Sequence, residues 1–202
     1  MNKVITIGRQ FGSGGREIGQ KLAESYGIPF YDNELISRAA KESGFAEETF
    51  QRAEEKATNS LLYSLAMGIN VYGNQDFGMG GLSLDDRIFL AQTNVIRKAA
   101  EEGPCVIVGR CADYVLREQP GVVNIFVHAS LDFRMQRAVE TYGIDKKVVA
   151  EQIVKKDKQR ANYYNYHVGE KWFNLTNYEL VLRSDVYGID RTVEAIQAYL
   201  GK

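Results

Sequence analysis

The stretch VITIGRQFGSGGREIG, residues 4–19, constrains the fold more than any other part of the chain. The β-branched run at residues 3–8 predicts a strand, and apolar residues at helical spacing predict a helix over about 15–26. Residues 28–32, IPFYD, predict a second short strand. A strand, a glycine-rich turn, a helix and another strand form a βαβ unit, which predicts a parallel sheet.

The rest of the chain continues this alternation. Further strands are predicted at residues 103–109, 122–129 and 178–184, and further helices at about 47–70, 84–102, 131–165 and 190–200. Five short strands interleaved with helices indicate a doubly wound α/β domain. Residues 71–83 hold four glycines and no apolar periodicity, so we expect a mobile loop there.

The glycine-rich turn fits a phosphate cradle with altered chemistry. Gly12, Ser13, Gly14 and Gly15 are small enough for several backbone N–H groups to point into one concavity at a helix N-terminus. A strict phosphate-binding loop reads G-x-x-x-x-G-K-[ST]. Here Gly15 stands in the place of the lysine and Arg16 follows it, and Glu17 occupies the place of the Mg²⁺-binding hydroxyl when the loop is matched to G-x-G-K-G-T. We expect Arg16 to restore the lost charge, because guanidinium binds phosphate well.

Two other interpretations of the turn stay open. Gly12 and Gly14 match the first two glycines of the dinucleotide fingerprint G-x-G-x-x-G, and Asp32 matches its acid about 20 residues further on. The third glycine is replaced by Glu17, which is too bulky for close packing of helix against strand. The turn could also be a tight turn that binds no ligand.

Charged side chains recur where strands end or on the helices that follow. In open parallel sheets, ligands bind at the carboxyl ends of the strands. An arginine directly after a buried strand is costly unless it has an anionic partner. This recurrence favours a polyphosphate site, whose candidate residues beyond the glycine loop are Asp32, Asn33, Arg38, Arg110, Arg134, Arg137, Asp157 and Arg160.

Composition excludes several other classes of function. The net charge of −1 provides no overall attraction to nucleic acid or membranes. No apolar run approaches the length that spans a bilayer, and the chain enters a strand pattern at once, so we expect no signal peptide and a cytoplasmic location. Cys105 and Cys111 lack the partners of a zinc site and are expected to be reduced thiols. With only two histidines, no protein metal site is predicted.

The chain resembles the cytidylate kinases, and more closely the cytidylate kinase-like branch of the P-loop nucleoside monophosphate kinases. YDNELISR is similar to the family's D-S-G-x-x-x-R segment, and GRCADYVL to its G-R-D-x-G-T-V-V segment, with Cys111 in place of the aspartate. HASLDFRMQRAV matches A-S-x-x-x-R-x-x-R, and DKQR matches the D-x-x-R of the lid. GSGGRE is what this branch tends to carry in place of G-x-G-K-G-T.

The resemblance implies a three-layer P-loop NTPase fold with a five-stranded parallel sheet, in one domain over residues 1–202. Its core would comprise 1–32, 96–139 and 169–202, with a nucleoside-monophosphate-binding insertion at about 33–95 and a helical lid at about 140–168.

The resemblance also implies roles for the candidate residues. ATP with Mg²⁺ would be held by Gly12, Ser13, Gly14, Gly15, Arg16 and Glu17, and Arg16, Arg134 and Arg137 would neutralise charge during transfer to CMP, dCMP or a similar small acceptor. Arg38 and Arg110 would hold the acceptor phosphate, Asp157 and Arg160 the pyrimidine, and Asp32 and Asn33 the rest of the nucleotide.

Two other functions stay open. The missing loop lysine and hydroxyl would suit a catalytically weak nucleotide-binding or sensor protein. The dinucleotide reading of the turn would suit a nicotinamide-dependent oxidoreductase. The sequence does not indicate an oligomeric state.

Overall fold

A central parallel sheet organises the molecule. The computed structural model describes residues 3–32 and 83–201, without the side chains of residues 84 and 87. The strands are β1 (Val4–Arg9), β2 (Phe30–Tyr31), β3 (Val106–Val108), β4 (Val122–His128) and β5 (Leu180–Arg183). They pair in the order β2-β3-β1-β4-β5, and every pairing is parallel. The predicted five-stranded α/β fold is confirmed.

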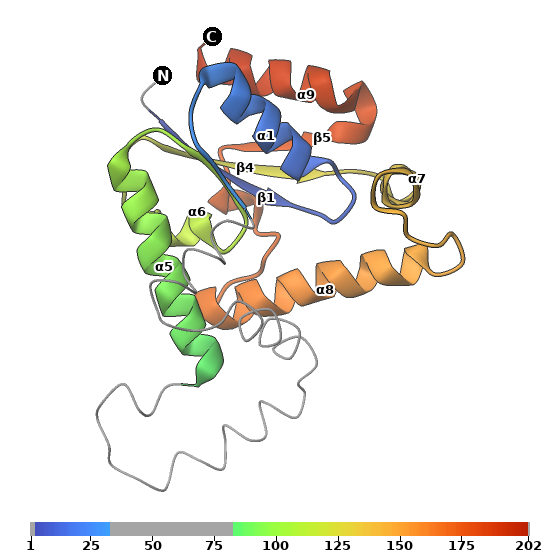
Figure 1. The fold of residues 1–202 in the computed structure, drawn as a ribbon, viewed down its shortest axis with the longest axis horizontal. Helices are drawn as coiled ribbons and strands as arrows, with labels where there is room; N and C mark the ends of the chain where they lie inside the picture. The colour runs from blue at the N-terminus through green and yellow to red at the C-terminus, as the bar shows by residue number, and fades with distance from the viewer. Residues whose placement is uncertain (1–2, 33–82, 202) are drawn as a thin grey trace, which may run out of the picture.

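Helices cover both faces of this sheet (Figure 1). Their bounds are α1 (Gly15–Tyr26), α5 (Leu84–Glu102), α6 (Ala112–Val115), α7 (Leu131–Tyr142), α8 (Val149–Val168), a short 3₁₀ helix η3 (Leu175–Asn177) and α9 (Ser184–Leu200). Helices α1 and α9 lie together on one face, and α5 and α6 lie on the other. Helix α8 runs beyond the sheet and contacts α7.

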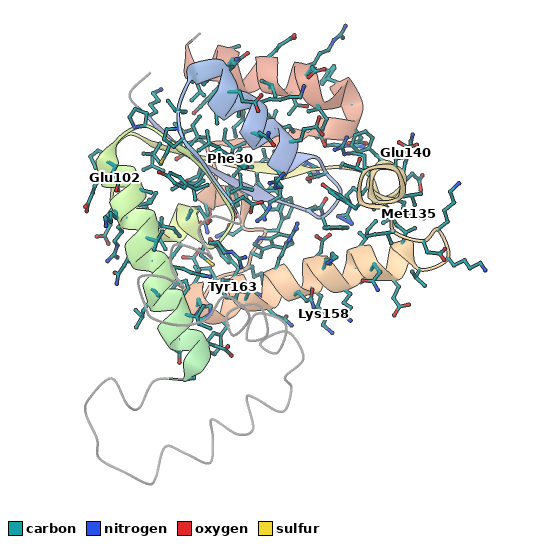
Figure 2. The ribbon with its side chains drawn as sticks, viewed as in Figure 1. Phe30, Glu102, Met135, Glu140, Lys158 and Tyr163 are labelled. Carbon is teal, nitrogen blue, oxygen red and sulfur yellow. The ribbon has the colours of Figure 1, made fainter. Side chains whose placement is uncertain are left out.

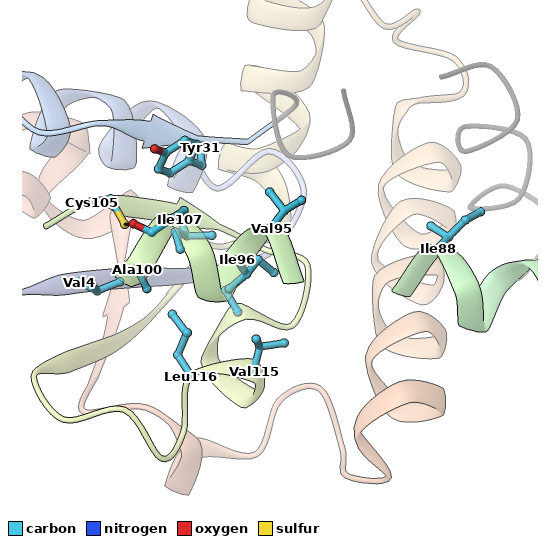
Figure 3. Packing of buried hydrophobic residues seen from close by; sticks show 12 residues of the cluster. Val4, Tyr31, Ile88, Val95, Ile96, Ala100, Cys105, Ile107, Val115 and Leu116 are labelled. Carbon is cyan, nitrogen blue, oxygen red and sulfur yellow. Dashed lines mark hydrogen bonds between the residues drawn. The ribbon is translucent and has the colours of Figure 1, made fainter. Parts of the chain in front are cut away.

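Each face has its own apolar core. On the α1 and α9 side, Ile18 and Leu22 are fully buried against Ile5 and Ile7 of β1. Figure 3 shows the other core, where Ile96 of α5 and Leu116 pack with buried side chains of the sheet. Since a strand buried on both faces must be apolar throughout, these cores explain the continuous β-branched runs in the sequence.

Some elements differ from the sequence prediction. The helix expected over 131–165 is two helices, because Gly143 adopts a left-handed conformation (φ 66°) and ends α7. The last helix begins at Ser184 and contains a non-helical residue, Gly188. The segments α6 and η3 were not predicted, and the predicted helix at 47–70 and nearly all of the glycine-rich loop at 71–83 lie outside the described residues.

The connections place a ligand crevice between β1 and β3. Helix α1 follows β1 on one face of the sheet, whereas α6 follows β3 on the other (Figure 1). In open α/β sheets, the carboxyl ends of two such neighbouring strands form the usual ligand-binding crevice. No helix in the described part of the chain is long and apolar enough to cross a membrane.

Gly19 sets how closely α1 approaches the sheet. A Cβ atom at this position would lie 2.9 Å from Val108 Cγ2 and 3.1 Å from Ile7 Cδ1. We predict that Gly19→Leu lowers the free energy of unfolding by about 1–3 kcal/mol through overpacking. Gln20→Leu on the exposed side of the same helix is the control and should stay close to wild type in urea denaturation. Equal midpoints for the two variants would contradict this packing.

Candidate active site

A cavity of about 900 Å³ opens at the carboxyl ends of β1 and β3. The loop after β1, the segment after β3 and helix α8 line it. The lining includes the following residues: Arg9, Gly12, Gly14, Gly15, Arg16, Asp32, Gly109, Arg110, Asp113, Tyr142, Lys155, Lys156, Gln159, Arg160, Tyr163 and Trp172. The cavity thus lies at the crevice that the strand order predicts.

The glycine loop is held rigidly by its neighbours. Gly12 and Gly14 both have a φ of 79°, a left-handed conformation that favours glycine. The hydroxyl of Ser13 donates to Gln10 O (2.9 Å), and the hydroxyl of Ser184, at the start of α9, donates to Ser13 O (2.6 Å). The loop therefore presents fixed backbone groups at the N-terminus of α1, which is the arrangement that binds anions.

Two arginines of α7 lie against this loop. The backbone O of Arg134 would be 2.7 Å from a Cβ at Gly12, and Arg137 Nε would be 3.5 Å from a Cβ at Gly14. The Nε atoms of both arginines are buried and make no hydrogen bond to the described residues. Such buried donors are costly without an acceptor, but neither arginine is among the residues that line the cavity.

Each of these arginines is also ion-paired. Arg134 Nη1 lies 2.7 Å from Asp157 Oδ2, and Arg137 Nη2 lies 2.7 Å from Glu17 Oε2. The other carboxylate oxygen of Asp157 accepts the backbone N–H of Phe11 at 2.7 Å. Asp157 thereby joins α8 to α7 and to the loop. Both of its oxygens are engaged by protein groups, and it is not among the residues that line the cavity.

Arg16 and Asp32 face each other at the mouth of the crevice. Arg16 Nε donates to Asp32 Oδ2 at 2.7 Å, and Arg9 Nη2 lies 3.7 Å from Asp32 Oδ1. The Arg16 side chain is 51% exposed, whereas the Asp32 side chain is 9% exposed. One carboxylate thus faces two guanidinium groups.

The segment after β3 has an unusual backbone. Gly109, Arg110 and Cys111 follow one another with φ values of 80°, 59° and 56°. Two consecutive residues other than glycine in the left-handed region are strained, and such strain concentrates at functional sites. The turn brings Arg110 to the cavity wall and buries Cys111, whose thiol pKa is raised by that burial. Both cysteines are free, and both are buried.

Helix α8 supplies the opposite wall. Lys155, Lys156, Gln159 and Arg160 line the cavity, while Lys158 lies on the face of α8 that points away from the sheet (Figure 2). Arg160 Nη1 donates to Arg9 O at 3.0 Å. Burial, followed by the positive charge of Arg9, lowers the pKa of Arg160. An anion bound in the cavity would relieve this repulsion.

Sequence reasoning missed several lining residues. Arg9 occupies the position of the first glycine in G-x-x-x-x-G-K, and this departure could have identified it. Asp113 is buried, and its Oδ2 accepts the hydroxyl of Tyr164 at 2.7 Å. Burial raises the pKa of Asp113. Among the predicted residues, Asn33 and Arg38 lie outside the described part of the chain.

Comparison with known proteins identifies the family. The sequence model of the cytidylate kinase-like family matches residues 4–186. The chain belongs to this family. It is 28% identical over 204 residues to the cytidylate kinase of Methanopyrus kandleri, covering 96% of this chain and 91% of the relative.

Solved structures confirm the P-loop kinase fold. An uncharacterized protein from Eubacterium ventriosum superposes with a TM-score of 0.70 at 29% identity, covering 98% of this chain and 97% of that one. Shikimate kinase from Bacteroides thetaiotaomicron superposes with a TM-score of 0.58 at 14% identity over the full length of both chains, which shows likeness of fold alone. Family and fold favour a phosphate cradle over a dinucleotide fingerprint for the glycine loop.

The pair Arg134–Asp157 makes a testable contribution to stability. The Arg134 side chain is 7% exposed, so Asp157→Ala would leave a buried cation without its carboxylate partner. We expect a loss of about 3–5 kcal/mol in the free energy of unfolding. Asp190→Ala, which breaks the exposed pair with Lys21, is the control and should leave the denaturation midpoint unchanged. A midpoint for Asp157→Ala equal to that of the control would refute the role given to this pair.

Proposed function

We propose that the protein is an ATP-dependent nucleoside monophosphate kinase that transfers the γ-phosphoryl group to CMP, dCMP or a similar small acceptor. The observation that carries the proposal is the cavity itself. A rigid glycine loop at a helix N-terminus faces a wall of cations across the carboxyl ends of β1 and β3. The name of the Methanopyrus kandleri relative supports the choice of CMP as the acceptor to test first.

The donor side would be formed by the loop and α7. Backbone groups from Gly12 to Gly15 would hold the phosphates of ATP, with Arg16 at the rim. The positive charges of Arg134 and Arg137, which lie against the loop, would neutralise charge on the transferring group. Phosphoryl transfer depends mainly on such positioning and charge neutralisation.

The acceptor side would be formed by Arg110, Arg160 and Asp32, together with Asn33 and Arg38. Arg110 and Arg38 would hold the acceptor phosphate, and Arg160 would contact the base. Asp157 would contribute to the recognition of that base indirectly, because it positions Arg134 and the glycine loop. Helix α8 would act as the lid, because it carries Lys155, Lys156 and Arg160 over the cavity.

The transfer needs no general base. The bond from the γ-phosphorus to the oxygen that bridges it to the β-phosphate breaks, and a bond forms to an oxygen of the acceptor phosphate. ADP and a nucleoside diphosphate result, and no proton has to move because the acceptor phosphate is already ionised.

The donor set fits Mg²⁺ that enters with the nucleotide. The described residues contain no cluster of three metal-ligating side chains. Mg²⁺ usually keeps several waters and takes one or two carboxylates besides the substrate phosphates. Asp32 and Asp113 are the carboxylates in the cavity lining, and Glu17 stands at the loop position of the usual hydroxyl. The ion would neutralise part of the phosphate charge.

A nucleotide-binding protein with little turnover is the second candidate. Its support is Glu17, which replaces the loop hydroxyl and is ion-paired with Arg137. Saturable ATP binding without ADP release in the presence of any acceptor would select it. With either function, we propose a cytoplasmic location.

The kinase proposal is tested by ADP release from Mg·ATP with a panel of nucleoside monophosphates, CMP and dCMP first. We expect Arg110→Ala to raise the acceptor KM about 10- to 100-fold, since a charge-assisted hydrogen bond contributes roughly 1.5–3 kcal/mol. Arg117→Ala, in the same segment but exposed and stacked on Tyr114, is the control and should keep the wild-type KM. An unchanged KM in Arg110→Ala would remove Arg110 from the acceptor site.

A further inference from the structure

The stem of Arg9 fills the space that a side chain at position 15 would need. A Cβ atom at Gly15 would lie 2.6 Å from Arg9 Cβ and 3.1 Å from Arg9 Cγ. Gly15 is not among the glycines with positive φ, so its backbone conformation does not itself call for glycine. The neighbouring arginine therefore excludes a lysine at the loop position where the motif has one.

The other end of Arg9 reaches the segment after β3. A Cβ atom at Gly109 would overlap the Arg9 guanidinium at Nη1. Gly109 directly precedes Arg110, which lines the cavity. A single side chain thus extends from the glycine loop to the wall assigned to the acceptor, and two glycines on different loops leave room for it.

Arg9 lies among other charged groups of the cavity. Its carboxylate neighbour Asp32, 3.7 Å away, is shared with Arg16, and its positive charge lowers the pKa of Arg160. The Arg9 side chain is 19% exposed and lines the cavity, whereas that of Arg16 is 51% exposed. Of the two, Arg9 is the more enclosed, and electrostatic interactions are stronger where water is excluded.

We propose that Arg9, entering from the end of β1, is the catalytic cation that takes the place of the missing loop lysine. The loop sequence predicts this role for Arg16, but the Arg16 side chain is half exposed. This role rests on the proposed kinase function. The Arg9 guanidinium contacts the transferring phosphoryl group while the bond from that group to ADP breaks and the bond from it to the acceptor forms. Arg9 neutralises charge and transfers no proton. Guanidinium suits this contact because it can donate two parallel hydrogen bonds to phosphate oxygens.

Moving the cation from position 9 to position 15 tests the role assigned to Arg9. Arg9→Gly should lower kcat about 10²- to 10³-fold, the usual effect of removing one preorganised donor. Gly15→Lys alone should also lower kcat, because the new side chain collides with the Arg9 stem. In the double variant Arg9→Gly with Gly15→Lys both close contacts with Arg9 are gone, and only the looser contact with Val127 Cβ at 3.3 Å remains. Because a loop cation also returns, kcat should recover about tenfold or more over Arg9→Gly. A double variant no better than Arg9→Gly, or kcat of Arg9→Gly within about threefold of wild type, would overturn the proposal.

A binding measurement separates this inference from the proposed function. Trp172 is the only tryptophan and lines the cavity, so its fluorescence can report titration with inorganic tripolyphosphate. Arg9→Ala should weaken tripolyphosphate binding about tenfold or more, and Lys21→Ala, on the exposed side of α1, should not change it.

The outcomes of the two measurements are distinct. If the wild type turns over no acceptor, the kinase function fails, and tripolyphosphate binding still decides whether Arg9 binds phosphate at this site. If the wild type turns over an acceptor and Arg9→Ala keeps both kcat and tripolyphosphate affinity, only the role of Arg9 fails. Absence of tripolyphosphate binding by the wild type would also overturn the role proposed for Arg9.

Discussion

Crowding of positive charge at one edge of the sheet is the constraint on which the site depends. Arg9, Arg16, Arg110 and Arg160 meet in one cavity with two lysines of α8, whereas Asp32 and Asp113 are the acidic residues in its lining. The whole chain carries a net charge of −1, so this excess is local. Like charges in a partly buried cavity repel one another. A bound polyphosphate would offset this repulsion, because its negative charges attract the cations around it.

The surrounding structure holds these cations in place. Asp157 connects α8 to α7 and the glycine loop through Arg134 and Phe11, and Ser184 ties the start of α9 to the loop. Glycines at 12, 14, 15 and 109 are sites where an added Cβ would collide with a neighbouring side chain or backbone. The loop sequence is therefore explained as much by the arginines and α9 packed around it as by the ligand it would hold.

Much of the fold could be predicted from the sequence because its signals are local. The bounds of α1 and α5 follow from apolar periodicity that ends at glycine, and the strands follow from β-branched runs. The four-residue α6 is too short for periodicity to show, and the break at Gly143 depends on a left-handed residue inside an otherwise helical pattern.

The candidate site was only partly predictable for a different reason. That Arg110 lies at the end of a strand can be read from the chain, and the structure places it at the cavity. That Arg9 occupies the space of a side chain at Gly15, or that Arg16 pairs with Asp32, depends on contacts between separate segments. Asp113 gave no signal because its burial against Tyr164 involves residues 51 positions apart.

We expect this cavity to align two phosphate-bearing ligands for transfer of a phosphoryl group from one to the other. The most direct measurement is ³¹P NMR of Mg·ATP and CMP incubated with the wild-type protein. We expect the resonances of ADP and CDP to grow in equal amounts as those of ATP and CMP fall. Resonances that stay unchanged, or growth of inorganic phosphate without CDP, would contradict it.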